Sequence, residues 1–342
     1  MNDPAAARPR YGPLKKALLL LLLGAAVLGT LVGHTAWRYL HDTSGNAALV
    51  LEISPGSSFA RILRELESQA LITRPLVFKA WARYTGMASQ IKAGEYEIPA
   101  DISPVKLLEL LVSGRVLLHQ FTIVEGWTFA QLREQLALSD AINHQTRALS
   151  DAELMAVIGK PDIHPEGQFL PDTYSFARGT SDSAFLLRAY DSMQTYLAEA
   201  WPERNPDIPL KTPYEALILA SIVEKETGQA FERPMIAGVF VSRLNKNMKL
   251  QTDPTVIYGM GDAFDGNIRR RDLRRDTPYN TYTRRGLTPT PIALAGRAAI
   301  DAVLHPAETD ALFFVSRNDG THKFSRTLAE HEAAVDKYQR NR

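Results

Sequence analysis

The sequence predicts an α+β fold in which a membrane helix precedes a small mixed module and a larger mixed domain. Three observations support this: an apolar segment near the N-terminus, predicted strands and helices that mix without regular βαβ alternation, and a turn-rich stretch at 251–296. A length of 342 residues suits an anchor and two folded units. The net charge of +1 gives no basic field for nucleic acid, and the absence of cysteine excludes disulfides and thiolate metal sites.

Residues 17–37 contain no Asp, Glu, Lys or Arg. A helix of this length spans about 30 Å, the thickness of a bilayer's hydrocarbon core. Four basic residues precede it: Arg8, Arg10, Lys15 and Lys16. The positive-inside rule therefore predicts a cytoplasmic segment at 1–16, a single-pass inner-membrane helix, a stalk at 38–46 and a periplasmic remainder. The alternative is a cleaved signal peptide, for which the apolar run is long.

A small α+β module is predicted at residues 47–125. Its strands alternate apolar and polar side chains, and its helices begin at serine, proline or a basic residue. The predicted strands are 48–53, 95–98 and 116–124, and the predicted helices are 58–66, 74–84 and 105–111.

The larger domain is predicted at 126–342. Its helices are expected at 129–136, 183–199, 213–227, 232–244, 296–304 and 328–339, and a buried strand at 311–316. The patterns at 140–165 and 251–296 are irregular. A long irregular stretch is unusual in a compact domain unless it forms a functional site, so 251–296 is expected to do so.

The helix at 213–227 carries the candidate catalytic residue. Leu219, Ile222, Val223 and Glu226 recur at helical spacing, which places Glu226 on an apolar face. Burial raises the pKa of a carboxyl group and can make it a general acid at neutral pH. Two alternatives remain: the helix end frays and Glu226 reaches water, or Glu224, about 200° round the axis, is the working carboxylate.

Two polar segments are candidates for substrate binding. The first offers the amide of Gln251, the carboxylate of Asp253 and the phenol of Tyr258 within what is expected to be a short loop. Asp253 precedes a proline, so it is equally a candidate helix cap. The second, at 279–282, contributes Asn280. Amides and carboxylates bind sugar hydroxyls, while aromatic rings cover the apolar faces of sugars.

Other chemistries lack their signatures. The eight histidines form no H-E-x-x-H motif, so no metal site is predicted, and His322 and His331 are expected to be structural. No G-x-S-x-G elbow, P-loop or G-x-G-x-x-G motif occurs. No cofactor is therefore expected.

Taken together, these residues resemble the YceG/MltG family of endolytic murein transglycosylases. The matching segments occur in the family's order at 166–174, 220–227, 251–261, 279–282, 286–293 and 313–331. The module at 47–125 is similar to the family's LysM-like domain. Thr288 replaces a proline of the family pattern, and Leu294-Ala295 stand where the family often has asparagine and proline. These departures concern fine specificity.

The resemblance implies that Glu226 is the catalytic acid and then base. It would cleave the MurNAc–GlcNAc bond of nascent glycan strands and leave 1,6-anhydroMurNAc ends, which would terminate elongation beside the peptidoglycan synthases. Three alternatives stay open: a glycoside hydrolase using Asp253 as second carboxylate, a non-catalytic peptidoglycan-binding scaffold protein, and a pyridoxal-phosphate lyase using Lys225.

Overall fold

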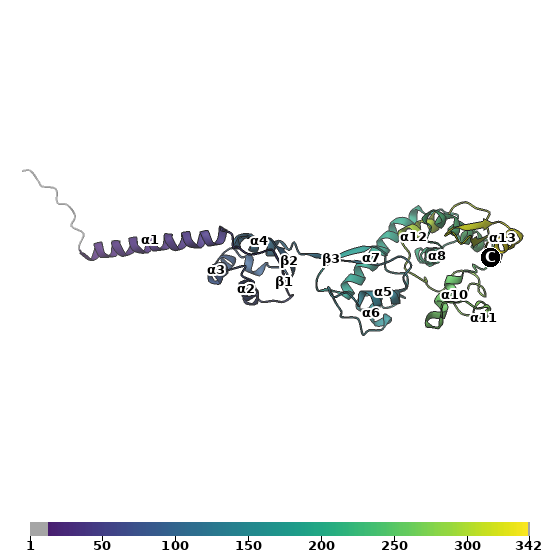
Figure 1. Ribbon diagram of the computed structural model, residues 1–342, viewed down its shortest axis with the longest axis horizontal. Coiled ribbons are helices and arrows are strands. Elements are labelled where there is room, and N and C mark those ends of the chain that lie inside the picture. Colours follow the sequence, from purple (N-terminus) through teal and green to yellow (C-terminus); the bar gives the residue numbers. More distant parts are fainter. Residues whose placement is uncertain (1–12, 341–342) are drawn as a thin grey trace, which may run out of the picture. The chain divides into compact units, whose positions relative to one another are not determined.

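The computed structural model describes residues 13–340, which divide into two compact units. The first comprises the described residues up to Leu118 together with Ala177–Gly179. The second comprises His119–Phe176 and the described residues from Thr180 onward. Figure 1 labels most of the helices and the strands β1, β2 and β3.

The first unit begins with α1 (Pro13–His41), which confirms the predicted N-terminal helix and extends it at both ends. Within α1, Lys15–His41 is long and apolar enough to cross a membrane, with a mean hydropathy of 2.2. Leu18–Leu23, Leu28 and Leu31 of this helix are exposed, as the lipid-facing residues of an isolated span would be, whereas Leu40 near its end is buried. Most of the predicted cytoplasmic segment 1–16 lies outside the described residues.

The remainder of the first unit is a mixed module whose predicted helices and first two strands are confirmed. Its elements are β1 (Leu49–Ile53), α2 (Phe59–Ser68), α3 (Pro75–Tyr84), the 3-10 turn η1 (Met87–Ser89), β2 (Gly94–Ile98) and α4 (Pro104–Ser113). Strands β1 and β2 pair antiparallel, with Leu51 opposite Tyr96. The Tyr96 ring is fully buried, and its hydroxyl donates to the carbonyl oxygens of Lys92 and Leu111. The amphipathic helices thus cover one small core.

The third strand predicted for the module has a different partner. It is β3 (Leu118–Thr122), which pairs with β5 (Thr173–Ala177) and not with β1 or β2. The contact boundary of the first unit accordingly falls at Leu118. A strand pattern indicates extended backbone but does not identify the partner strand, which is why this pairing was not predictable.

The second unit contains nine α-helices and six strands, counting β3, among its described residues. After β3 the chain forms α5 (Phe129–Leu136), β4 (Ile142–Asn143), α6 (Asp151–Val157), β5, β6 (Thr180–Ser181), α7 (Asp182–Ala200) and η2 (Trp201–Glu203). Then come α8 (Pro213–Glu226), η3 (Ala230–Glu232), α9 (Arg233–Asn245), α10 (Asp253–Met260), η4 (Gly261–Ala263), α11 (Arg270–Arg274) and α12 (Arg297–Leu304). The chain closes with β7 (Phe313–Ser316), β8 (His322–Ser325), α13 (Leu328–Val335) and the π-helical turn η5 (Asp336–Arg340).

Two hydrophobic cores support this unit. One gathers the aromatic residues around Phe169 and Phe185, between α5, α6 and α7. The other surrounds α8, which packs against α9 and α12 (Figure 1). The segment 292–295 contributes to both, because Leu294 belongs to the first core and Ile292 to the second.

Two stretches expected to be irregular contain helices. In 140–165, the helix α6 begins at a capping box formed by Ser150 and Glu153. In 251–296, the expected short loop after Gln251 is the helix α10. Both helices are short, and the second contains Pro254 in its first turn, so turn-forming residues obscured the periodic pattern.

Candidate active site

The helix α8 presents the site from the centre of the second core. Thr212 caps its N-terminus by accepting from the backbone N–H of Glu215, and Pro213 opens the first turn. All eight residues from Ala216 to Val223 are buried, so the helix is enclosed on every side and not along one stripe. Its last residue is Glu226, after which Thr227 turns into extended backbone.

Glu226 is held by a neighbouring loop and does not extend freely into water. Its side chain is partly buried, and Oε1 accepts a hydrogen bond from the hydroxyl of Thr252. Burial raises the pKa of Glu226 to about 7, and the negative charge of Asp253 adds to this effect. The Thr252 hydrogen bond, His322 and Arg243 act in the opposite direction without overcoming it. Part of the Glu226 population therefore carries a proton at neutral pH.

The two polar segments predicted to bind substrate meet beside Glu226. The backbone N–H of Thr252 donates to Oγ1 of Thr281 at 3.1 Å, and that of Gln251 donates to the Thr281 carbonyl oxygen at 3.2 Å. The hydroxyl of Tyr282 donates to Oδ1 of Asp253 at 2.6 Å. The exposed carboxylate of Asp253 is thus fixed close enough to Glu226 to influence its proton affinity.

Gln251 lies at the entrance to this loop in an unusual conformation. Its φ of 52° is in the left-handed region, which costs a non-glycine residue about 1 kcal/mol or more. The guanidinium of Arg243 compensates by donating to Oε1 of Gln251 at 3.3 Å and to the carbonyl oxygens of Lys249 and Leu250. Arg243 therefore fixes the backbone immediately before Thr252.

Tyr258 belongs to a separate cluster farther along α10. Its hydroxyl donates to Oε2 of Glu166 at 3.0 Å, and its ring packs edge-on against Tyr279 with centroids 4.9 Å apart. Glu166 is buried, and its Oε1 accepts from the backbone N–H of Phe129. Burial raises the pKa of Glu166 to about 7 as well. The protein thus contains a second carboxyl group that titrates near neutrality.

Asn280 is buried and supports the loop. Its Nδ2 donates to the carbonyl oxygens of Asp272, Leu273 and Arg275, and its Oδ1 accepts from the backbone N–H of Tyr282. The side chain therefore binds carbonyl oxygens at the C-terminal end of α11 and orients Tyr282, whose hydroxyl donates to Asp253. This geometry makes Asn280 a positioning residue.

Glu224 faces a different part of the domain. Its side chain is 5% exposed, and Oε1 accepts from Arg233 at 3.0 Å while Oε2 accepts from the backbone N–H of Gly296 at 3.0 Å. These contacts join α8 to the start of α9 and α12. They occupy both carboxylate oxygens, so the geometry favours Glu226 over Glu224 as the group that meets substrate.

We expect Glu224→Gln to destabilise the protein, because removing one partner of a buried ion pair costs about 3 kcal/mol. The measurement is the denaturant midpoint of the full chain in a neutral detergent. Glu134→Gln, at an exposed position in the same unit, is the matched control and should leave the midpoint unchanged. A Glu224→Gln protein of full stability that cannot cut glycan would instead identify Glu224 as the working carboxylate.

The loop at 286–293, which contains Pro289 and Pro291, bonds to α8 and supports it. The backbone N–H of Ile292 donates to Oγ of Ser221 at 2.9 Å, and the hydroxyls of Tyr279 and Thr290 bond each other at 2.9 Å. Thr288 is buried and donates to the carbonyl oxygen of Thr290. The Thr288 departure noted in the sequence therefore affects loop structure, since its hydroxyl is used inside the loop.

Sequence reasoning did not identify three side chains that shape the site. Thr252 bonds Glu226, Arg243 fixes the Gln251 turn, and Tyr282 holds Asp253. The signal for Thr252 was its position directly before Asp253 and Pro254, which is the N-cap position of a helix. Arg243 carried no local signal, because its partners are brought close only by the fold.

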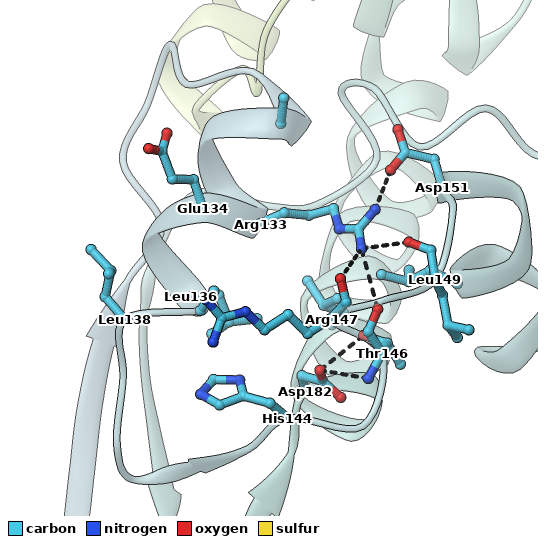
Figure 2. Close-up of a pocket in the computed structure, with 14 residues that line it drawn as sticks. Arg133, Glu134, Leu136, Leu138, His144, Thr146, Arg147, Leu149, Asp151 and Asp182 are labelled. Atoms are coloured by element: carbon cyan, nitrogen blue, oxygen red, sulfur yellow. Dashed lines mark hydrogen bonds and ion pairs between the residues drawn. The ribbon is translucent and has the colours of Figure 1, made fainter.

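A pocket of about 640 Å³ lies elsewhere in this unit, beside α5 and α6. Figure 2 shows Arg133 reaching Asp151 and the carbonyl oxygens of the 146–149 loop, while Asp182 accepts from Thr146. These bonds satisfy the charged groups of Arg133, Asp151 and Asp182 internally. None of the predicted site residues lines this pocket. Across the described residues, no cluster of three or more His, Asp or Glu side chains is arranged to hold a metal ion.

Comparison with known proteins gives consistent matches. The YceG-like family model matches residues 51–337. An endolytic murein transglycosylase of Bacillus subtilis (strain 168) is 32% identical over 305 residues, covering 84% of each chain. One of Streptococcus pneumoniae (strain R6) is 25% identical over 364 residues, and the match covers 94% of this chain and 65% of the relative. The crystal structure of a yceG-like protein from Listeria monocytogenes is similar, with a TM-score of 0.54, 27% identity and coverage of 84% of this chain and 99% of that chain.

Proposed function

Because the chain belongs to the YceG-like family, we propose that it is an endolytic murein transglycosylase in which Glu226 is the catalytic acid and base. The observation that carries the proposal is the position of Glu226. This carboxyl has a pKa raised to about 7 and lies at the end of a buried helix, against Thr252 and Asp253 at the start of α10. Such a group can both give and take a proton near neutral pH.

The proposed reaction uses this carboxyl twice. Protonated Glu226 donates its proton to the oxygen that links C1 of N-acetylmuramic acid to N-acetylglucosamine, and the C1–O bond breaks. The carboxylate then takes the proton of the C6 hydroxyl, whose oxygen bonds to C1. No water is consumed, Glu226 is reprotonated, and the products are a free N-acetylglucosamine hydroxyl and a 1,6-anhydro end.

The surrounding residues have supporting roles in this proposal. The negative charge of Asp253 stabilises the positive charge that develops at C1, and Gln251 offers its exposed amide to sugar hydroxyls. Tyr258 and Asn280 act through their neighbours, since their polar atoms already bond Glu166 and the α11 carbonyl oxygens. Lys225 donates to the carbonyl oxygen of Gly126 and has no part in the reaction.

The location of the activity follows from the anchor. We propose that α1 crosses the inner membrane once, with the N-terminus in the cytoplasm and both folded units in the periplasm. The module at 47–125 would be LysM-like and bind glycan, which would bring nascent strands to the enzyme as the synthases extend them. Cutting there would terminate strand elongation.

The alternative reaction is hydrolysis, and the charge of Asp253 close to Glu226 is the observation in its favour. The test digests purified murein with the full chain in a neutral detergent and weighs the products. Anhydro ends are lighter than reducing ends by one water. We expect anhydro ends. Products that carry only reducing ends would establish hydrolysis, and an absence of cleavage would leave a scaffold role.

A further inference from the structure

An arginine cluster lies beside the proposed active site and has no role in the reaction above. Residues 269–285 contain seven arginines and two aspartates, a local net charge of +5 in a chain whose total is +1. The seven are Arg269, Arg270, Arg271, Arg274, Arg275, Arg284 and Arg285. They lie at the N-cap of α11, within α11 and in the loop that follows it, next to α10 (Figure 1). The charge is thus concentrated on one edge of the domain.

Three aspartates, counting Asp265 just before the cluster, pair with only three of its arginines. Arg269 pairs with Asp265 at 2.5 Å, Arg284 pairs with Asp276 at 2.9 Å, and Arg271 approaches Asp272 at 3.6 Å. The other four arginines are exposed and form no ion pair with any part of the chain that the structure describes: Arg270, Arg274, Arg275 and Arg285. Like charges held this close repel one another, so the arrangement favours an external anion.

The cluster borders a pocket of about 530 Å³. Arg269, Arg271 and Arg275 line it together with Asp272 and Thr277. The rest of the lining is a face of α10 and the following turn: Val256, Gly259, Met260 and Ala263. The same helix begins at Asp253, beside Glu226. Asp253 and Gly259 are six positions apart, about 9 Å at the rise of a helix. A ligand in this pocket therefore lies within reach of a glycan bound at Glu226.

We propose that this arginine cluster binds the carboxylate groups of the peptides that hang from murein, and so makes the enzyme prefer peptide-bearing glycan. The inference rests on the proposed function. Where a peptide is attached, the lactyl carboxyl of N-acetylmuramic acid is part of an amide bond, so the negative charge of a peptide-bearing strand lies on its peptides. A strand without peptides keeps only the single lactyl carboxylate of each muramic residue, close to the glycan. Arginine is suited to this ligand because its planar guanidinium binds a carboxylate through two parallel hydrogen bonds.

The dimensions agree with this assignment. A peptide of four or five residues spans about 13–17 Å when extended. It leaves the lactyl group of the muramic residue, whose C1 must lie at Glu226 for the bond to be cut. A peptide on this sugar can therefore reach the pocket at Gly259, about 9 Å from Asp253 along α10, without displacing the glycan from the site.

The experiment compares two substrates with the full chain in a neutral detergent. One is peptide-bearing murein strands without cross-links, and the other is the same strands after an amidase has removed the peptides. The test protein is the triple variant Arg270→Gln, Arg274→Gln, Arg275→Gln. The control changes three exposed arginines elsewhere in the second unit: Arg147→Gln, Arg317→Gln, Arg326→Gln.

We expect the wild type and the control to prefer peptide-bearing strands in kcat/KM by about tenfold, the effect of a few exposed charge pairs. The test variant should lose this preference, and raising the salt concentration should weaken it in the wild type. Equal cutting of both substrates by the wild type, or an unchanged preference in the test variant, would overturn the proposal.

A binding measurement separates this inference from the proposed function. Glu226→Gln protein, with and without the three arginine changes, is titrated with both kinds of strand. Preferential binding of peptide-bearing strands that depends on the arginines supports the inference even if no cleavage is ever observed. Should the arginines matter only when phosphatidylglycerol is added to the detergent, equally for both substrates, the partner is an anionic lipid surface and the peptide assignment is wrong.

Discussion

Glu226→Gln is expected to lower the rate of glycan cleavage by at least about 10³-fold, within the range of general acid–base catalysis. The amide cannot supply a proton to the leaving oxygen or take one from the C6 hydroxyl, so both steps fail together. Glutamine keeps the size of the side chain, and its oxygen still accepts from Thr252. The fold should therefore persist. The measurement is the initial rate of product release from purified murein by the full chain.

The control for this substitution is Glu134→Gln, which makes the same chemical change at an exposed position of the same unit. It should cut at the wild-type rate. Retention of more than about a tenth of the activity by a folded Glu226→Gln protein would exclude Glu226 as the acid, since a missing general acid costs about 10²-fold or more. Asp253 would then be the first residue to test.

The sequence predicted the positions of the helices and strands more completely than it predicted which strands pair. The helices of the first module and α5, α7, α8 and α9 were located from helical spacing and from serine, threonine or proline at their starts. These signals are local. The pairing of β3 with β5 joins residues far apart in the chain, and no local pattern contained it.

The candidate site could likewise be predicted only in part. Glu226 and Asp253 were identified because a carboxylate among apolar residues and a polar segment before a proline stand out in the sequence. The burial of α8 proved to be complete from Ala216 to Val223, so the single apolar stripe was an underestimate. Arg243, Tyr282 and Glu166 acquire their roles only when α9, the 279–282 turn and the 166–170 segment are brought together by the fold.

The cleavage rate should fall as the pH rises above about 7, because only protonated Glu226 can donate to the glycosidic oxygen. Burial, aided by the charge of Asp253, raises the pKa of Glu226 to about 7, so the acid form is lost through this pH. Well above the pKa, kcat/KM should fall about tenfold for each further pH unit. A pH profile of kcat/KM between 5 and 9, measured with the full chain, gives the apparent pKa.

Two variants assign this alkaline limb to one carboxyl group. Glu166 also has a pKa raised to about 7, but its oxygens bond the Phe129 N–H and the Tyr258 hydroxyl, away from Thr252. Glu166→Gln should therefore keep the limb. Thr252→Val removes a hydrogen bond that stabilises the charged form of Glu226, so the limb should move to higher pH. If the decline at high pH disappears in Glu166→Gln and keeps its midpoint in Thr252→Val, the group that donates the proton is Glu166 and not Glu226. The reason is that loss of a hydrogen bond changes the pKa of the group that accepted it, so the midpoint moves only when that group is the acid.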